Sequence, residues 1–362
     1  MRESRVGKLL SGLKTPRPKT SRGPMKPLVI VIAAVVLANS VDLPNTPLAL
    51  LVAQDRIADV VGQVKKALGG DKLAAVKAIR AEGPFRRSMG QRDMEGTILL
   101  TIVRPDKLRR SEEMTMGGMV GGPTVERVSA FNGTEAWDDV QNRGGMGGGM
   151  RMEIRNGPPP GAAGPGGSPL TPEQIEQQRL RRMKMELQRW TVALFADSAQ
   201  PFTDAGVAES PDGKADVLET KDEAGRAVRL FVDQRTHLPL MVQYQEVRPR
   251  MMMMGGPGRR ERSAGANPGA TGATGAAGAE SGAPQRPSEE EMRQRMEEMR
   301  KQGPPPPSAF AMHLSDYKKV DGVMLPHKIE ISIEGQPNEE WTIEKYKVNP
   351  SIKADEFAKP KQ

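Results

Sequence analysis

Alternating apolar and polar positions are the main pattern in this sequence of 362 residues. In DGVMLPHKIEISIEGQ, residues 321–336, isoleucines stand at every second position from Ile329 to Ile333. A period of two predicts a β-strand with one buried face. The Asp321-Gly322 step directly before it is typical of a hairpin turn, so we expect this strand to belong to an antiparallel sheet.

Similar patterns recur along the chain and predict many short strands joined by glycine-containing turns. An antiparallel sheet of this size twists and curls instead of staying flat. We therefore predict a mainly β (α+β) fold, a curled antiparallel half-barrel of about 11–12 strands with a helical lid. The predicted strands cover residues 80–90, 95–104, 107–115, 124–131, 135–140, 206–210, 215–222, 226–233, 238–247, 308–320, 323–334 and 339–348.

Three segments follow a helical period and provide material for the lid. In residues 54–68 the apolar positions fall on one side of a helix. A short second helix is predicted over residues 71–79. The third covers residues 171–194, where Thr171 is a capping residue and Pro172 occupies the first helical position.

The first 53 residues are predicted to be a signal peptide or another N-terminal targeting segment. Eight Lys or Arg residues precede the apolar run LVIVIAAVVLA, residues 28–38. This run is too short to span a bilayer and suits the apolar core of a signal peptide. Translation from Met25 would give an ordinary export signal, with cleavage expected after Ala38 or Ala53. We predict a periplasmic protein, with a retained N-terminal anchor as the alternative.

Two stretches rich in Gly, Pro and Met, at about 143–169 and 248–307, are predicted to be disordered insertions. Such segments bury too little apolar surface to offset the loss of chain entropy. Residues 288–302 of the second carry a capping box and a charged helical pattern. Residues 54–362 are therefore predicted to form a single domain with two insertions.

The formal net charge of +8 reflects mainly the N-terminal residues. From Gln54 onward the chain has 45 basic and 43 acidic residues. No basic groove with aromatic stacking residues is indicated in that part, so we expect no nucleic-acid partner.

Catalytic and metal-binding motifs are scarce. The sequence has no cysteine, which excludes disulfides and thiolate sites. No nucleophile-elbow, phosphate-loop or dinucleotide-binding motif occurs between a strand and a helix. The adjacent carboxylates Asp138 and Asp139 lie on a predicted strand and would face opposite sides. We predict that the protein is not an enzyme and has no catalytic residue, metal site or cofactor.

Methionine offers a minor alternative, because the chain has 22 of these residues. Many lie in the insertions, including Met251–Met254. Thioethers are soft ligands that suit Cu(I). Compositional drift in a flexible segment explains the same pattern without a metal.

The apolar faces of the strands permit two interpretations. Ile98, Leu100 and Ile102 share one face of a strand, and Val228 to Val232 repeat the pattern on another. These residues either fill a core between sheet and helices or line a hydrophobic cavity beneath a helical lid. The pattern alone does not distinguish a filled core from a cavity.

Five motifs follow one another in a characteristic order. They are IVRPDKLRRSEEM (102–114), SAFNGTEAWDD (129–139), LFVDQRTHLPLMVQY (230–244), SDYKKVDGVMLPHKI (315–329) and EWTIEKYKVNPSI (340–352). In this order they resemble the LolA/LolB-like superfamily of periplasmic lipoprotein carriers and outer-membrane lipoprotein-sorting proteins. The long insertions are foreign to the small carriers, and this departure leaves the cargo open.

The resemblance implies an open barrel whose helical lid encloses the acyl chains of a lipoprotein. It implies that Arg104 matches the arginine that helps to control lid opening and cargo transfer, and that Trp137 occupies the aromatic position after the turn. Burial of an acyl chain is favourable by about 0.8 kcal/mol per CH₂. The predicted residues of the cavity and its gate are Arg104, Ile98, Leu100, Ile102, Trp137, Val228, Leu230, Val232, Leu240, Ile329, Ile331 and Trp341.

The predicted function is a non-enzymatic periplasmic binding protein for a lipid or for lipoprotein acyl chains, with a role in outer-membrane lipoprotein sorting. The expected partners are these acyl chains and an envelope protein, while membrane contact is transient at most. The alternative is a structural or sensory envelope protein with a filled core that binds a partner protein through its flexible insertions.

Overall fold

The structure is a computed structural model that describes residues 47–89, 92–115, 124–143, 171–211, 213–247, 294, 306–353 and 355–360. All of them belong to one unit, Ala34–Gln362. Residues 1–46 of the predicted signal lie outside this description, and the predicted boundary at residue 54 falls inside the first helix. The two predicted insertions, with Met251–Met254, also lie outside it except at their ends and at residue 294.

Three helices and thirteen strands make up the described part of the chain. The helices are α1 (Pro47–Leu68), α2 (Asp71–Ala74) and α3 (Pro172–Phe195). The strands are β1 (Ala78–Met89), β2 (Arg92–Val103), β3 (Lys107–Thr115), β4 (Thr124–Phe131), β5 (Ala136–Arg143), β6 (Thr203–Ser210), β7 (Gly213–Lys221), β8 (Ala227–Asp233), β9 (Pro239–Glu246), β10 (Ser308–Val320), β11 (Val323–Ile333), β12 (Gln336–Thr342) and β13 (Lys345–Val348).

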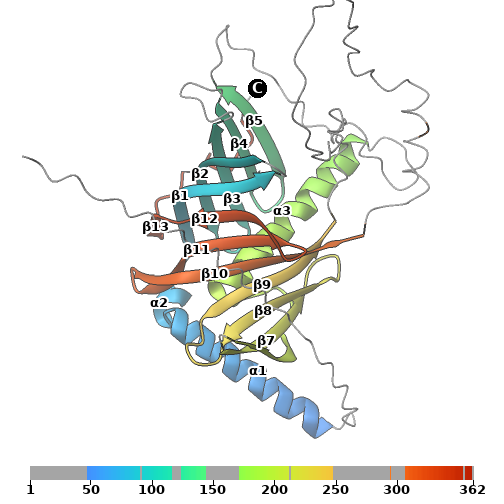
Figure 1. The fold of residues 1–362 in the computed structure, drawn as a ribbon, viewed down its shortest axis with the longest axis vertical. Coiled ribbons are helices and arrows are strands. Elements are labelled where there is room, and N and C mark those ends of the chain that lie inside the picture. Colours follow the sequence, from blue (N-terminus) through green and yellow to red (C-terminus); the bar gives the residue numbers. More distant parts are fainter. Residues whose placement is uncertain are drawn as a thin grey trace, which may run out of the picture. The chain divides into compact units, whose positions relative to one another are not determined.

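All thirteen strands pair in one antiparallel sheet (Figure 1). The order is β5-β4-β3-β2-β1-β12-β11-β10-β9-β8-β7-β6, with β13 added beside β1. Strands β5 and β6 are the two edges and do not pair with each other, so the sheet curls without closing. The predicted mainly β half-barrel is confirmed.

The number of strands exceeds the prediction because residues 339–348 form two strands instead of one. Strand β1 pairs with β13 over Ile79–Glu82 and with β12 over Phe85–Arg87. Gly83 lies at the point of change, and a Cβ atom there would be 2.0 Å from the carbonyl oxygen of Thr342. Only glycine permits this approach of the two backbones.

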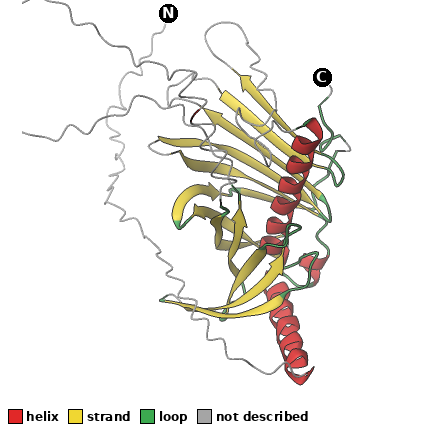
Figure 2. Ribbon diagram, turned by 90° about the vertical axis from the view of Figure 1, so that its right-hand side faces the viewer, coloured by secondary structure: helices red, strands yellow, loops and turns green. Residues whose placement is uncertain are grey.

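Helix α3 lies across the sheet on the same side as α1 (Figure 2). It joins the two edge strands in the sequence and contacts β3, β4 and β5 as well as β8 and β9. Helix α1 contacts β6 and β11. The predicted helix over residues 71–79 is shorter than expected, because β1 already begins at Ala78. No helix in the described ranges combines the length and the apolar character needed to cross a membrane.

The main hydrophobic core lies between the inner face of the sheet and the helices. Val60, Val64 and Leu68 of α1 meet side chains from both halves of the sheet there. Trp190 of α3 stacks on Trp341 of β12, with ring centroids 5.2 Å apart. This aromatic pair joins the helix to the middle of the sheet.

Leu240 departs from the prediction that it faces the interior. The pairing of β8 with β9 shifts by one residue, so that Phe231 pairs with Met241 and Val232 with Pro239. Leu240 has no partner in this register and is 40% exposed. A bulge interrupts the alternation on which the prediction relied. The assignment of Leu240 to an interior cavity is therefore wrong.

A pair of leucine truncations tests this account of the core. Replacement of Leu230, which is 0% exposed, by alanine should lower the unfolding free energy of the protein by about 2–5 kcal/mol. Leu240→Ala should change the same quantity by less than about 0.5 kcal/mol. Urea unfolding of both variants measures the difference, and equal losses would contradict the placement of these two residues.

Candidate functional site

A stripe of charged residues on α3 faces the sheet. Arg179, Arg182, Glu186 and Arg189 follow one another at intervals of three or four residues, which places them on one side of a helix. The helix begins in a capping box in which the side chain of Thr171 accepts a hydrogen bond from the backbone of Gln174. The stripe is thus held on a helix whose first turn is locally stabilised.

Each residue of the stripe has a charged partner on the sheet. The partners come from β3, β5 and β9, so α3 is tied to strands on both sides of the half-barrel. The ion pairs are Arg179–Asp138 (3.1 Å), Arg182–Asp138 (2.7 Å), Glu186–Arg110 (3.3 Å) and Arg189–Glu246 (2.8 Å).

Strand pairing aligns the partners on the sheet in rows. Arg110 on β3 pairs with Ser129 on β4, which pairs with Asp138 on β5. The next row places Glu112 beside Arg127. Residues two apart on a strand share a face, so both rows lie on the inner face of the sheet.

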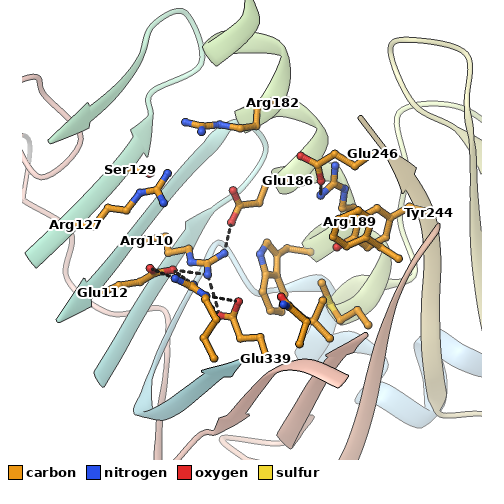
Figure 3. A pocket seen from close by; sticks show the side chains of 16 residues that line it. Arg110, Glu112, Arg127, Ser129, Arg182, Glu186, Arg189, Tyr244, Glu246 and Glu339 are labelled. Carbon is orange, nitrogen blue, oxygen red and sulfur yellow. Dashed lines mark hydrogen bonds and ion pairs between the residues drawn. The ribbon is translucent and has the colours of Figure 1, made fainter. Parts of the chain in front are cut away.

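Arg110 is the centre of a network of ion pairs (Figure 3). Its guanidinium pairs with Glu112, with Glu339 at 2.9 Å and with Glu186 at 3.3 Å. Arg87 makes two hydrogen bonds to Glu112, at 2.8 and 3.0 Å, and also pairs with Glu339. The network therefore joins two arginines to three carboxylates from β1, β3, β12 and α3, with one negative charge in excess.

The ion pairs shift the pKa values of Glu112, Arg110 and Asp138. Burial alone would raise the pKa of Glu112, but Arg110 and Arg87 outweigh it and hold the pKa at about 2, below the ordinary 4.5. Burial disfavours the charge of Arg110, yet Glu112 and Glu339 raise its pKa. Burial likewise opposes the charge of Asp138, whose pKa is lowered by Arg182 and by a hydrogen bond from Ser129. Glu112, Arg110 and Asp138 therefore stay charged at neutral pH.

Trp341 connects the charged network to the hydrophobic core. The guanidinium of Arg110 lies 5.0 Å from the centre of the Trp341 ring, which also stacks on Trp190. The indole N–H of Trp341 donates a hydrogen bond to Glu339. The same side chain therefore has an apolar partner in the core and charged partners in the network.

The network borders a cavity of about 250 Å³ between α3 and the inner face of the sheet (Figure 3). One part of its wall is charged and includes Arg110, Arg127 and Arg182. Another part is apolar. Its apolar lining residues are Trp190, Phe310, Met312 and Ile331. The cavity is therefore amphipathic, whereas the sequence predicted a hydrophobic one.

Most of the residues predicted to line a cavity lie in the core instead. They are 2% exposed or less and belong to one cluster. These residues are Ile98, Leu100, Ile102, Val228, Leu230, Val232, Ile329 and Trp341. Only Ile331 of the predicted set lines the amphipathic cavity.

Two further predicted residues lie apart from the cavity. Trp137 belongs to a separate small cluster with Val128 and Ala130, and its indole N–H donates a hydrogen bond to the carbonyl oxygen of Phe357 at 3.0 Å. Arg104 pairs with Asp197, just beyond α3, at 2.8 Å. The guanidinium of Arg104 also lies 4.8 Å from the centre of the Phe195 ring.

The sequence-based prediction missed Arg110, Glu112, Arg182 and Glu339. Their signal was present in part, because Arg110 and Glu112 are in phase with the buried residues Leu108 and Met114 of β3. A charged residue at an inward position needs a charged partner.

The described residues contain no cluster of three or more His, Asp or Glu side chains arranged to hold a metal ion. Asp138 and Asp139 face opposite sides as predicted, since Asp138 pairs with α3 while Asp139 accepts a hydrogen bond from Gln141. His327 contacts the carbonyl oxygen of Ile343 at 2.7 Å through Nδ1.

Comparison with known proteins gives structural similarities only. No protein-family model matches the sequence, and no curated protein matches it. The chain is similar to a domain from Vibrio parahaemolyticus described as an outer membrane lipoprotein-sorting protein domain, with 12% identity, a TM-score of 0.37, and coverage of 84% of this chain and 97% of that one.

Two other solved structures have the same TM-score of 0.37. A DUF1329 family protein from Desulfovibrio piger is 10% identical, and the match covers 83% of this chain and 96% of that one. A LolA superfamily protein from Nitrosomonas europaea is 8% identical, with coverage of 83% and 97%. The superfamily that the sequence motifs resemble is thus represented among the similar structures.

The low pKa of Glu112 predicts how stability depends on pH. Because the pKa is about 2 in the folded state and 4.5 ordinarily, the ionised side chain stabilises the fold above about pH 4.5, and this contribution is lost as the pH falls toward 2. Glu112→Gln should lower the unfolding free energy at pH 7 by about 3 kcal/mol, because it leaves the buried charge of Arg110 with one carboxylate fewer. The loss is not larger, because Glu339 still neutralises part of the arginine charge.

Urea unfolding between pH 7 and pH 2.5 measures this difference, which should shrink as the pH falls. Glu113→Gln is the matched control, since Glu113 is the next residue of β3 and is exposed. Its stability should follow that of the wild type at every pH. A constant difference between Glu112→Gln and the wild type would contradict the role of the ionised carboxylate.

Proposed function

We propose that this chain is a non-enzymatic binding protein for an acylated, amphipathic ligand. The observation that carries the proposal is the cavity beneath α3, whose apolar wall lies beside a charged one. An acyl chain against Trp190, Met312 and Ile331 would gain about 0.8 kcal/mol per buried CH₂ group. The resemblance of the sequence motifs to LolA/LolB-like carriers favours the same class of ligand.

The electrostatics of the cavity support binding over catalysis. Glu112 and Glu339 are fixed between arginines, and the pKa of Glu112 is about 2. A carboxylate with so low a pKa is a poor proton acceptor at neutral pH. The charged side chains therefore suit the orientation of a ligand better than proton transfer.

An exported location fits this role. The N-terminal pattern of basic residues followed by an eleven-residue apolar run supports passage to the periplasm. A binding protein with an acylated ligand would there move its cargo between membranes. Outer-membrane lipoprotein sorting is the process that we propose.

A larger side chain in the apolar wall tests the proposal. Ile331 lines the cavity and is half-buried, so Ile331→Trp should obstruct the ligand without placing a charge in the core. We expect the affinity for myristate, measured by isothermal titration calorimetry, to fall about tenfold or more. Leu240→Trp is the control, because Leu240 is an exposed aliphatic residue of the same sheet.

Both variants must unfold cooperatively for the comparison to hold. If the folded Ile331→Trp variant binds myristate as tightly as the wild type, the cavity is not the binding site. Native mass spectrometry of the protein recovered from the periplasm complements this titration. A mass adduct that is present in the wild type and absent from Ile331→Trp would reveal the class of the natural cargo.

The filled core supports a second candidate function. Leu100, Leu230 and Val232 are almost completely buried, so the deepest part of the half-barrel holds protein side chains. A structural or sensory envelope protein that binds a partner through residues 248–307 would need no ligand cavity. This candidate takes precedence if the full chain shows no acyl adduct and takes up no myristate.

The second insertion can be removed at a defined point. Glu246 at the end of β9 and Ser308 at the start of β10 are direct neighbours in the sheet. Deleting residues 249–305 and joining the strands through a short glycine-containing turn should therefore preserve the hairpin. We expect the myristate affinity to stay within about twofold of that of the wild type, so the binding free energy should change by well under 1.4 kcal/mol. Loss of binding in this folded variant would assign the ligand to the insertion.

A further inference from the structure

Arg127 differs from the other arginines that line the cavity. It lies on the inner face of β4 and is half-buried. No hydrogen bond or ion pair joins it to any residue that the structure describes, whereas Arg87, Arg110, Arg182 and Arg189 all have carboxylate partners. The guanidinium is nevertheless close enough to Glu112 and Asp138 to favour their charged forms. A half-buried cation without a direct partner calls for an anion.

Two neighbouring arginines also have unused donors. The Nε atoms of Arg110 and Arg182 are buried and find no hydrogen-bond partner among the described residues. Both side chains line the same cavity as Arg127. In Figure 3 the guanidinium groups of Arg110, Arg127 and Arg182 gather on one side of it. Buried donors without partners are rare in folded proteins, and here two of them lie at the cavity that Arg127 also lines.

The local balance of charge agrees with this observation. Asp138 already accepts hydrogen bonds from Arg179, Arg182 and Ser129. Arg127 adds a further positive charge close to Asp138. Among the described residues that line the cavity there are five arginines and four glutamates, and the arginine without a direct ion pair is Arg127.

We propose that this part of the cavity binds an anionic group, a phosphate or a carboxylate, through Arg127 together with the free donors of Arg110 and Arg182. The inference rests on the proposed function, because the anion would be the head of the acylated ligand whose chain lies on the apolar wall. Guanidinium groups bind planar and tetrahedral oxyanions through charge-assisted hydrogen bonds. The ligand class is therefore an anionic amphiphile.

Three probes separate the head from the chain. Tetradecyl phosphate carries both, methyl myristate carries the chain without a charge, and inorganic phosphate carries the anion alone. Each is titrated below its micellar concentration into the purified full chain by calorimetry. Quenching of tryptophan fluorescence provides a second readout, because Trp190 lines the cavity.

The test variant is Arg127→Gln, which removes the charge without breaking an ion pair among the described residues. We expect it to weaken binding of tetradecyl phosphate about tenfold or more, corresponding to the loss of a charge-assisted hydrogen bond, and to leave methyl myristate unaffected. Arg86→Gln is the matched control, because Arg86 lies on the same sheet and is exposed. It should bind all three probes as the wild type does.

The remaining outcomes distinguish the two proposals. Equal affinities for tetradecyl phosphate and methyl myristate, both unaffected by Arg127→Gln, would overturn the anion site and leave the acyl-binding function intact. Binding of inorganic phosphate alone, sensitive to Arg127→Gln, would support the anion site and overturn the acyl-binding function. If none of the probes binds, both proposals are wrong.

Discussion

The charge of Arg110 is the constraint on which the interior of this protein depends. A guanidinium keeps its proton at any physiological pH, so its burial against the Trp341 ring requires carboxylates around it. Those carboxylates are Glu112, Glu186 and Glu339, which come from β3, α3 and β12. The removal of one partner leaves a buried charge less compensated, which is strongly unfavourable. The position of α3 on the sheet is therefore fixed by electrostatics as well as by apolar packing.

The inner face of the sheet is divided into two chemical regions. Toward α1 and α2, side chains such as Ile102 and Leu108 form a dry core, while Arg110 and Arg127 lie beside the cavity. Trp341 stands at the boundary and contacts both. One curled sheet thus carries a packed apolar core on one part of its inner face and a charged cavity beside another part. It also explains why an apolar strand pattern locates the core more readily than the site.

Sequence patterns that act over a few residues predicted most of the fold but little of the candidate site. Alternation at Ile98–Ile102 and hairpin turns such as Asp321-Gly322 act over a few residues, so they predict strands and their order. The bulge at Leu240 and the contact of Trp137 with Phe357 depend on neighbours elsewhere in the structure. The pairing of Arg110 with Glu339 joins residues 229 positions apart. Alternation shows that a charged residue faces inward, but it does not identify the partner.

The ion pair between Arg189 and Glu246 connects α3 to the end of β9 at the wall of the cavity. Glu246 is the last residue of β9, and the chain leaves the sheet directly after it. A force applied to the chain after Val247 would therefore reach Glu246 first, and Glu246 is the residue of β9 that forms the ion pair with α3. The point at which the chain leaves β9 is therefore also a point at which α3 is held to the sheet.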